Sequence, residues 1–291
     1  MYFNMRKTED LKIKCADGFE LSVTLYEPAV VVKAAVMIGS ATGIKKEFYN
    51  SFSTFLAQRG YGVISYDNRG IGKSKNFSIN NCKASLVSWG KLDMPAVLEK
   101  LQSVFPDTSY HLIGHSAGGQ LVGLMYNATD ITSMLNFASS SGSIKNMNYP
   151  FKLHAAFLLN VFLPLSNLLF GCTKAQWVGM GEPLPKLVAL QWRKWCNGKG
   201  YVAMDFGKSI KKHWYDELTF PSQWLYATDD DMANLENVKD MIRVYTKTDA
   251  AIVALDPQKL GYKEIGHMKF FSSKNEGLWS YVLNWLEIHE K

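Results

Sequence analysis

Short runs of consecutive apolar residues, separated by amphipathic stretches, restrict the fold of this chain more than any other feature. Strands buried on both faces are apolar at successive positions, whereas half-exposed strands alternate. Runs of the first kind occupy residues 32–40, 61–67, 109–114 and 131–139. The stretches that follow, 46–60, 84–105 and 118–127, have the apolar spacing of helices. Strands and helices in alternation predict an α/β fold, a mostly parallel twisted sheet with helices on both faces.

The alternation extends toward both ends of the chain but is broken in the middle. Residues 11–28 alternate polar and apolar on either side of Asp17-Gly18, which predicts a β-hairpin. Residues 143–220 do not follow the strand–helix pattern, which resumes after them. We therefore expect 143–220 to form a helical cap inserted into an α/β core of residues 1–142 and 221–291.

Composition is that of a soluble globular protein, with 47% hydrophobic and 20% charged residues. The net charge of +6 is not gathered into a basic stripe, so we expect no nucleic-acid partner. The densest lysine clusters, Lys45–Lys46 and 208–212, are interpreted as solvated faces. Two Gly-Lys-Ser sequences lack the first glycine of a phosphate-binding P-loop, since Asp67 and Val202 stand in its place.

The cysteines and the first residues indicate a reducing compartment. None of the four cysteines forms a C-x-x-C pair. Residues 1–10 lack the apolar core of a signal peptide. We therefore expect free thiols in a cytoplasmic protein.

Residues 153–171 form the most apolar segment of the predicted cap. Asn160, Pro164, Ser166 and Asn167 interrupt it, so we expect no helix that inserts stably across a membrane. Three roles stay open for the segment: a helix packed on the core, the lining of an acyl pocket, or a helix in peripheral contact with a membrane surface.

A glycine–serine turn joins one predicted strand to the helix that follows it. The turn reads Gly114-His115-Ser116-Ala117-Gly118, a G-x-S-x-G pattern. A strand before and a helix after are the context of a nucleophile elbow, which projects a serine hydroxyl above the sheet. Glycines flank such a serine because larger side chains would collide in so sharp a turn. We interpret Ser116 as a nucleophile.

A serine nucleophile needs a base, and the order along the chain in an elbow of this kind is serine, acid, histidine. His154 and His213 lie in the predicted cap, and His289 is two residues from the C-terminus. His267 lies in a loop between the last predicted strand and the last helix. We predict that His267 is the base.

The acid that orients the histidine should follow one of the late strands. Residues 139–146, after one such strand, contain no carboxylate. The next core strand is followed by Asp229, Asp230 and Asp231. Alternation along the strand points Asp229 and Asp230 to opposite sides, and the residues alone leave open which aspartate is the acid.

The oxyanion hole needs two backbone N–H donors. Ala117 follows the nucleophile at a helix N-terminus, where the helix dipole favours negative charge, and is the first candidate. The second should come from the small-residue loop Gly39–Gly43. We choose Ala41, with Ser40 and Thr42 as alternatives.

Substrate contacts are expected beside the nucleophile and from the cap. A cap above an elbow covers the place where the acyl chain or the leaving group must lie. The predicted substrate-binding residues are His115, Thr42, Phe157, Phe162 and Trp192.

These motifs resemble those of the α/β-hydrolase superfamily over nearly the whole chain. "GHSAGG" resembles its nucleophile elbow, "YDNRGIGKS" the loop after its fourth strand, and "IGHMKFF" its histidine loop. "GSATGIKKEFY", "GMGEPLPKLVALQWRKWC" and "IGHMKFF" together are similar to a family of predicted bacterial α/β hydrolases. The resemblance implies an α/β-hydrolase fold and a serine hydrolase, without naming a substrate.

The resemblance also bears on the acid and on the oxyanion loop. In the superfamily the seventh strand is commonly followed by G-x-x-D and a small apolar stretch. Laid on "ATDDDMAN", this pattern places Asp230 at the aspartate, with Asp229 as the alternative. Many members carry His-Gly before the oxyanion loop, whereas Gly39-Ser40 stand there in this chain.

The predicted reaction is hydrolysis of a carboxylic ester or thioester, with a small or acyl-chain substrate, through an acyl-enzyme. Ser116 is the nucleophile, His267 the base and Asp230 the orienting acid. This chemistry needs no metal and no organic cofactor. Two alternatives stay open: acyl transfer to another acceptor by the same residues, and a non-catalytic binding module on the same fold. No feature of the sequence indicates an oligomeric state.

Overall fold

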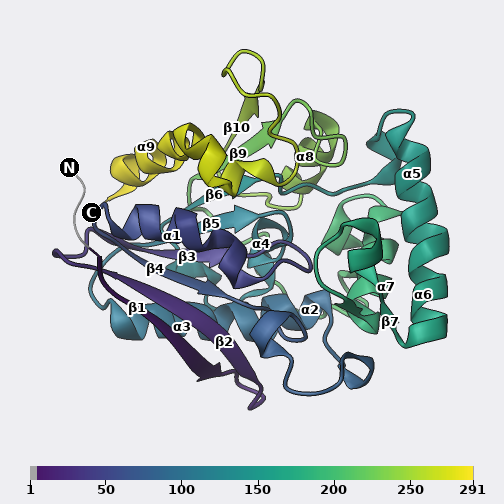
Figure 1. Ribbon diagram of the computed structural model, residues 1–291, viewed down its shortest axis with the longest axis horizontal. Coiled ribbons are helices and arrows are strands. Elements are labelled where there is room, and N and C mark those ends of the chain that lie inside the picture. The colour runs from purple at the N-terminus through teal and green to yellow at the C-terminus, as the bar shows by residue number, and fades with distance from the viewer. Residues whose placement is uncertain (1–4, 291) are drawn as a thin grey trace.

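The computed structural model describes residues 5–290 and centres on one eight-stranded sheet (Figure 1). The strands are β1 (Met5–Lys14), β2 (Glu20–Pro28), β3 (Ala34–Gly39), β4 (Tyr61–Tyr66), β5 (Tyr110–His115), β6 (Ser133–Phe137), β9 (Ser222–Ala227) and β10 (Ala250–Leu255). Their order across the sheet is β1-β2-β4-β3-β5-β6-β9-β10. The β1–β2 and β2–β4 pairs are antiparallel and the other pairs are parallel. The mostly parallel sheet confirms the predicted fold class.

The expected strands form where the apolar runs stand. β3 and β4 are buried along their whole length, because helices cover both of their faces. β1 and β2 form the predicted hairpin around Asp17-Gly18. Gly18 has a φ of 79°, a left-handed conformation that glycine adopts at little cost.

Helices cover the sheet in two layers, each with its own apolar core. The α-helices are α1 (Asn50–Ala57), α2 (Leu86–Ser88), α3 (Met94–Val104), α4 (Ala117–Gln120), α5 (Phe151–Phe157), α6 (Leu163–Phe170), α7 (Lys186–Cys196), α8 (Leu235–Ile242) and α9 (Ser280–His289). On one face, Trp279 just before α9 packs edge-on against Phe52 and Phe55 of α1. On the other face, α3 and α8 contribute Val97 and Met241 to the second core.

The helix expected at residues 118–127 is much shorter than predicted. α4 ends at Gln120, and one 3-10 turn follows it. The carbonyl oxygens that would continue the helix accept hydrogen bonds from elsewhere. The Gly119 oxygen accepts from the Tyr245 hydroxyl at 2.5 Å, and the Gln120 oxygen accepts from the Tyr215 hydroxyl at 2.6 Å. Tertiary hydrogen bonds therefore take the place of helical ones.

Residues 143–220 lie between β6 and β9 and hold α5, α6, α7 and a short hairpin of β7 (Cys172–Thr173) and β8 (Leu184–Pro185). In Figure 1 these helices stand together at the right of the molecule, beside the sheet. A π-helical turn, η8 (Leu158–Phe162), joins α5 and α6 into one helix from Phe151 to Phe170. That the segment acts as a cap stays a prediction.

The residues expected to interrupt the apolar segment do not interrupt its helix, which runs from Phe151 to Phe170, and the absence of a stable membrane insertion stays a prediction. The helix is 20 residues long with a mean hydropathy of 1.7, which suffices to cross a membrane by length and composition alone. Pro164 does not break the helix. It lies in the first turn of α6, directly after the π-turn, where proline is tolerated. Within its most apolar stretch 28% is buried, so part of the helix packs on the protein and part does not.

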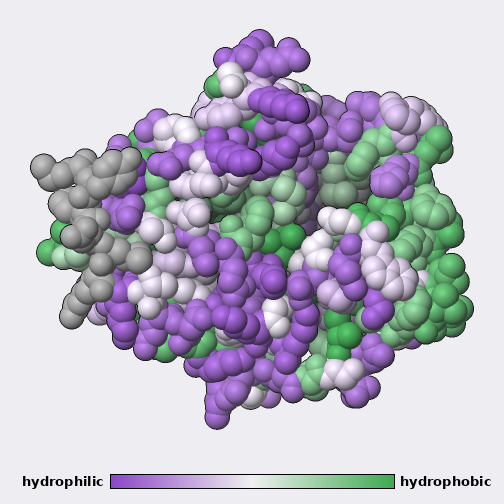
Figure 2. All heavy atoms as spheres, viewed as in Figure 1, coloured by the Kyte–Doolittle hydropathy of each residue, from purple (hydrophilic) through white to green (hydrophobic). Residues whose placement is uncertain are grey.

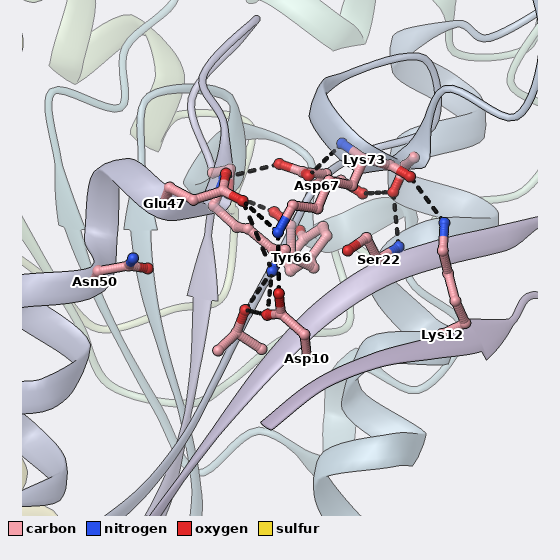
Figure 3. Close-up of polar contacts among 12 residues, drawn as sticks. Asp10, Lys12, Ser22, Glu47, Asn50, Tyr66, Asp67 and Lys73 are labelled. Carbon is pink, nitrogen blue, oxygen red and sulfur yellow. Dashed lines mark hydrogen bonds and ion pairs between the residues drawn. The ribbon is translucent and has the colours of Figure 1, made fainter. Parts of the chain in front are cut away.

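Lys46 is buried, which corrects the interpretation of Lys45–Lys46 as a solvated pair. Its ammonium group donates to Asp10 Oδ1 at 2.6 Å. Figure 3 shows the surrounding network, in which the Lys73 ammonium contacts both Asp10 and Glu47. The hydrogen bond from Lys46 is the main cause that holds the pKa of Asp10 well below its usual range. The network ties β1 to the segment that follows β3.

The loop after β4, which resembles the superfamily motif, braces its neighbours. The Asp67 carboxylate accepts backbone N–H groups of Lys46 and Lys73, each at 2.8 Å (Figure 3). Burial raises the pKa of Asp67 to about 6. The Arg69 guanidinium bonds the buried Asp93 carboxylate, with 2.5 Å from Nε to Oδ1. These contacts tie the loop after β4 to the segment that follows β3 and to the residue just before α3.

Candidate active site

Ser116 stands at the turn between β5 and α4 in the backbone conformation of a nucleophile elbow. Its φ is 50° and its ψ is −114°, which a residue with a side chain rarely adopts. The surrounding structure holds this strained turn in place. The Ser116 N–H donates to the Phe137 carbonyl oxygen at 2.9 Å, and the Ser139 hydroxyl donates to the Ser116 carbonyl oxygen at 2.9 Å. Strain of this kind is typical of functional positions.

The glycines around Ser116 are required by close contacts. A Cβ on Gly114 would lie 2.4 Å from Asn136 Oδ1. A Cβ on Gly118 would lie 2.1 Å from the carbonyl oxygen of Gly39, so the elbow packs directly on the loop after β3. A larger residue at Gly114 would collide with β6, and one at Gly118 would force the elbow away from the loop after β3.

His267 and Asp230 form a hydrogen-bonded pair. His267 Nδ1 lies 2.7 Å from Asp230 Oδ2, and the Asp230 side chain is buried. The other carboxylate oxygen, Oδ1, accepts the backbone N–H groups of Met232 and Ala233, each at 2.9 Å. Both oxygens of Asp230 are therefore held, which fixes the plane of the carboxylate and the orientation of the His267 ring.

The two partners shift each other's pKa in opposite directions. Burial works to raise the pKa of Asp230, but the His267 charge and hydrogen bond outweigh it and hold that pKa below its usual range. Burial works to lower the pKa of His267, but the Asp230 carboxylate outweighs it and raises that pKa above its ordinary value of 6.5. A histidine that favours the protonated form beside an ionised aspartate is a suitable general base.

The neighbouring aspartates of the run have different surroundings. Asp229 accepts the backbone N–H groups of Ile265 and Gly266, at 3.0 and 2.9 Å, just before His267 in the chain. Asp229 therefore holds the histidine loop. Asp231 lines the cavity described below and is exposed. The structure thus gives Asp229 a positioning role that the sequence did not reveal.

Ser116, Asp230 and His267 line one cavity of about 360 Å³. This volume is in the range of small-molecule sites. Thr42 and Trp192, both predicted to contact the substrate, line the same cavity. The structure therefore brings together the three predicted catalytic residues and two of the predicted substrate contacts, while their roles stay predictions.

A second, more apolar cavity adjoins the first. It has a volume of about 170 Å³ and lies against the inner side of α5, η8 and α6, with Phe162 among its lining residues. The residues that line both cavities are Phe151, Met180, Leu184, Trp192 and Met232. These shared side chains form the wall between the two cavities, so the second cavity lies directly beside the first, toward the apolar helix.

The prediction that His115 contacts the substrate is wrong. His115 is fully buried, and its Nε2 lies 2.9 Å from the carbonyl oxygen of His267. Its Nδ1 lies 2.8 Å from the Tyr49 hydroxyl. A carbonyl oxygen only accepts, so Nε2 carries the proton and Nδ1 accepts from Tyr49. Burial is the main cause that lowers the pKa of His115 to about 3, so the ring is neutral and supports the His267 backbone from behind.

The N–H of Ala41 is already engaged, which contradicts its choice as second oxyanion donor. It donates to the Tyr49 hydroxyl at 2.9 Å. The Ala41 carbonyl oxygen accepts the Ile44 N–H at 3.2 Å and closes a turn. Thr42 lies within this turn and lines the cavity, so its N–H becomes the second candidate. Ala117 begins α4, where the helix leaves N–H groups unused, and stays the first.

The three aromatic residues that were predicted to contact the substrate from the cap lie in different places. Trp192 lines both cavities and Phe162 lines the second. Phe157 lines neither cavity and is 55% exposed, so its prediction as a substrate contact is wrong. The helix turns Phe157 outward while its neighbours Ala155 and Leu158 line the second cavity.

Sequence reasoning missed two kinds of functional residue. Met180 and Met232 line both cavities, and no motif marks an apolar lining residue. Tyr49 joins the oxyanion loop to His115, and its role depends on packing between distant segments. Its place within the "GSATGIKKEFY" stretch was the one available signal.

Outside this site, the described residues contain neither a metal-binding cluster nor a reactive cysteine. Among residues 5–290 no group of three or more His, Cys, Asp or Glu side chains could hold a metal ion. The four cysteines are buried and form no disulfide, which confirms the prediction of free thiols. Burial raises the pKa of Cys15 to about 12 and also raises that of Cys82, so these thiols are protonated rather than nucleophilic.

Comparison with known protein families gives a match to the part of the chain that contains Ser116. A profile of the family described as serine aminopeptidase, S33, matches residues 31–183. The matched stretch begins before β3, includes the turn at Ser116 and extends past α6. No curated protein sequence matches the chain.

Solved structures resemble this one along nearly its whole length. An esterase of Pyrococcus furiosus is 14% identical, with a TM-score of 0.60, over 99% of this chain and 92% of that one. A thermophilic esterase from Thermogutta terrifontis, with malate bound, is 13% identical, with a TM-score of 0.60, over 97% and 100%. An acylaminoacyl peptidase of Pyrococcus horikoshii is 13% identical, with a TM-score of 0.57, over 100% of this chain and 42% of that one. At such identities the likeness concerns the fold.

Proposed function

Because this chain belongs to the serine aminopeptidase S33 family of α/β hydrolases, we propose that it hydrolyses carboxylic esters of acyl-chain substrates. It is a serine hydrolase with the α/β-hydrolase fold that its motifs predict. The ester substrate, the acyl-enzyme and the Ser116–His267–Asp230 triad are the parts that we propose. Two of the similar structures are esterases, which agrees with an ester substrate.

One observation carries the proposal. A serine in a strained elbow lines the same cavity of about 360 Å³ as a half-buried histidine whose Nδ1 lies 2.7 Å from the carboxylate of a buried aspartate. Each part has a cost in isolation, either in backbone strain or in buried charge. Their convergence on one cavity is what nucleophilic acyl transfer requires.

The proposed reaction has two halves. Ser116 Oγ attacks the ester carbonyl carbon while its proton passes to His267 Nε2, and Asp230 stabilises the imidazolium through Nδ1–H. The N–H groups of Ala117 and Thr42 receive the oxyanion. The carbon–oxygen bond to the alcohol then breaks, and the alcohol leaves with the proton from His267. Water repeats the sequence on the acyl-enzyme, giving its proton to His267, and the acid and free Ser116 result.

The second cavity gives the acyl chain a place to lie. It adjoins the first cavity at Met180 and Trp192 and lies against the inner side of the helix from Phe151 to Phe170. Its lining is almost wholly apolar, with Thr173 and His154 as its polar residues. An alkyl chain gains about 0.8 kcal/mol for each methylene buried in such a space. We propose that residues 143–220 act as a cap that selects for the acyl chain.

A panel of p-nitrophenyl esters of increasing chain length tests the proposal. Wild-type protein should hydrolyse them, with kcat/KM rising with chain length until the second cavity is filled. Ser116→Ala should lower turnover by about a million-fold, toward the background rate. Ser103→Ala, an exposed serine of α3, is the matched control and should leave the rates unchanged. Equal rates for wild type and Ser116→Ala would refute the serine mechanism.

A second candidate is cleavage of a substrate with a free amino group. Asp231 and Glu264 line the cavity beside His267, and a carboxylate near the scissile bond can bind an ammonium group. The name of the family is consistent with this activity. Amino-acid p-nitroanilides should therefore be included in the panel. Turnover of these amides faster than of any ester would replace the ester proposal with an aminopeptidase.

A further inference from the structure

The helix from Phe151 to Phe170 exposes large apolar side chains along one side, which we name the outer face. Its members, with their exposed fractions, are Leu153 62%, Phe157 55%, Val161 49%, Leu165 50%, Leu168 79% and Leu169 63%. Figure 2 shows the apolar colouring gathered over this part of the molecule, at the right where Figure 1 places α5 and α6. Contiguous exposed apolar side chains of this size are typical of surfaces that bind a partner or a membrane.

The outer face is continuous because of the π-turn. Leu153, Phe157, Val161, Leu165 and Leu169 follow one another at intervals of four residues. In an α-helix with about 3.6 residues per turn, such a series drifts around the axis. The turn η8, in the middle of the series, holds more residues than an α-turn and opposes the drift. The apolar side chains therefore stay on one side for the length of the helix.

The opposite side of the same helix packs on the protein. Ala155, Leu159 and Leu163 are buried, and all three line the second cavity. The helix is thus apolar on both sides, with one side covered by its own chain and the other uncovered. A helix anchored in this way lies along a surface and does not cross a bilayer.

The charges around the outer face are positive. No aspartate or glutamate occurs between Asp130 and Glu182 in the chain. Two lysines lie at the ends of the helix, where the Lys152 ammonium is 5.7 Å from the Tyr149 ring and the Lys174 ammonium is 5.6 Å from the Phe170 ring.

The wider segment repeats this imbalance of charge. Residues 143–220 contain ten lysines and arginines but four aspartates and glutamates, an excess equal to the net charge of +6 on the whole chain. The remainder of the chain is balanced, so the segment that bears the apolar face also bears the net charge.

We propose that the outer face of α5, η8 and α6 docks on an anionic lipid surface. Apolar side chains flanked by lysines match a membrane interface, with chains in the acyl region and ammonium groups among the phosphates. Tyr149 and Trp177, 71% and 61% exposed, are amphipathic aromatics of the kind that gather at that depth. A second copy of the chain fits less well, because two such faces would bring like charges together. The proposal does not depend on the hydrolase chemistry.

Vesicle binding measured by sedimentation tests the proposal. Wild-type protein should bind vesicles of phosphatidylcholine mixed with phosphatidylglycerol. The double variant Leu168→Ser/Leu169→Ser should bind them about tenfold more weakly or worse, from the apolar area lost. The matched control, Val31→Ser/Ile288→Ser, removes two side chains that are 91% and 75% exposed elsewhere and should bind like wild type. Circular dichroism and thermal unfolding without vesicles report that each variant is folded.

The charge contribution is tested separately. Lys152→Gln/Lys174→Gln should lose about fivefold in affinity for each lysine with anionic vesicles and little with phosphatidylcholine alone. Lys259→Gln, with a side chain 84% exposed outside the segment, is the control. Absence of vesicle binding by wild type, or equal binding by Leu168→Ser/Leu169→Ser, would overturn the proposal. A wild-type dimer that this variant converts to monomer, with no vesicle binding, would assign the face to a second copy instead.

Discussion

The candidate active site and the outer face of α5 and α6 use their side chains in opposite ways. At the site the acid is held by several partners, because Asp230 bonds His267 and two backbone N–H groups. On the outer face, Leu168 and Leu169 are 79% and 63% exposed and offer only shape and apolar area. The contrast separates two tasks: acyl transfer needs fixed distances, whereas recognition of an alkyl chain or a lipid surface tolerates adjustment. Substitutions in the two regions should therefore fail in different ways.

The largest effect is expected at the acid. Asp230→Asn keeps the size of the side chain but removes the charge that stabilises the imidazolium and selects the tautomer of His267. We expect kcat to fall by about 10⁴-fold, as for the same change in serine proteases. Circular dichroism should show an unchanged fold. A fall of less than tenfold in folded protein would remove Asp230 from the triad.

A smaller, substrate-dependent effect is expected in the second cavity. Ala155→Leu adds three carbons to a buried wall of that space, so long acyl chains lose room while short ones do not. We expect kcat/KM for long-chain p-nitrophenyl esters to fall about ten- to a hundredfold, at about 0.8 kcal/mol for each methylene displaced. The acetate ester should react as before.

Ala156→Leu is the control for this change, because Ala156 lies on the same helix and lines neither cavity. Equal losses for short and long esters in Ala155→Leu would mean that the acyl chain lies elsewhere.

Substitution of Asp229 or Asp231, the other two aspartates of the run, should lower the rate less than the changes above. Asp229→Asn keeps one oxygen for the N–H groups of Ile265 and Gly266, so the loop of His267 loosens without losing its base. We expect kcat to fall about tenfold, near the energy of one charged hydrogen bond. Asp231→Asn should change kcat for esters by less than about twofold, as surface substitutions usually do. If Asp229→Asn costs more than Asp230→Asn, the two roles are exchanged.

The smallest effect is expected in the pH dependence of kcat/KM. His267 must be neutral to accept the serine proton, and its pKa lies above 6.5 because of Asp230. The rate constant kcat/KM should therefore rise with pH through a midpoint above 6.5 and level off beyond it. Asp230→Asn should move this midpoint to lower pH, since the raising charge is gone. A midpoint below 6.5 in wild type would contradict the assignment of the base.

The parts of the site that follow from chain order were predictable, and those that follow from packing were not. The elbow at Ser116 and the loop of His267 are local patterns in a fixed order, and the structure places both at one cavity with Asp230. The N–H of Ala41 is taken by a hydroxyl from Tyr49, eight residues away. No local pattern reports such a contact, because it depends on how the segment after β3 folds back.

Burial and helix phase account for the other differences. His115 points inward because alternation along β5 continues to the elbow, and Lys46 is buried because Asp10 of β1 reaches it. Phe157 turns outward because it lies four residues after Leu153 on the exposed side of α5, and the composition of residues 153–171 does not reveal which side of the helix is exposed. The fold class was predictable because it depends on many apolar runs at once.

The most direct test is labelling by a fluorophosphonate, which reacts only with an activated serine. The account predicts one adduct per chain, mapped by peptide mass spectrometry to the peptide that contains Ser116. The adduct should be absent in Ser116→Ala and should form far more slowly in Asp230→Asn. An adduct on another serine, or none in folded wild-type protein, would contradict the assignment of Ser116 as the nucleophile.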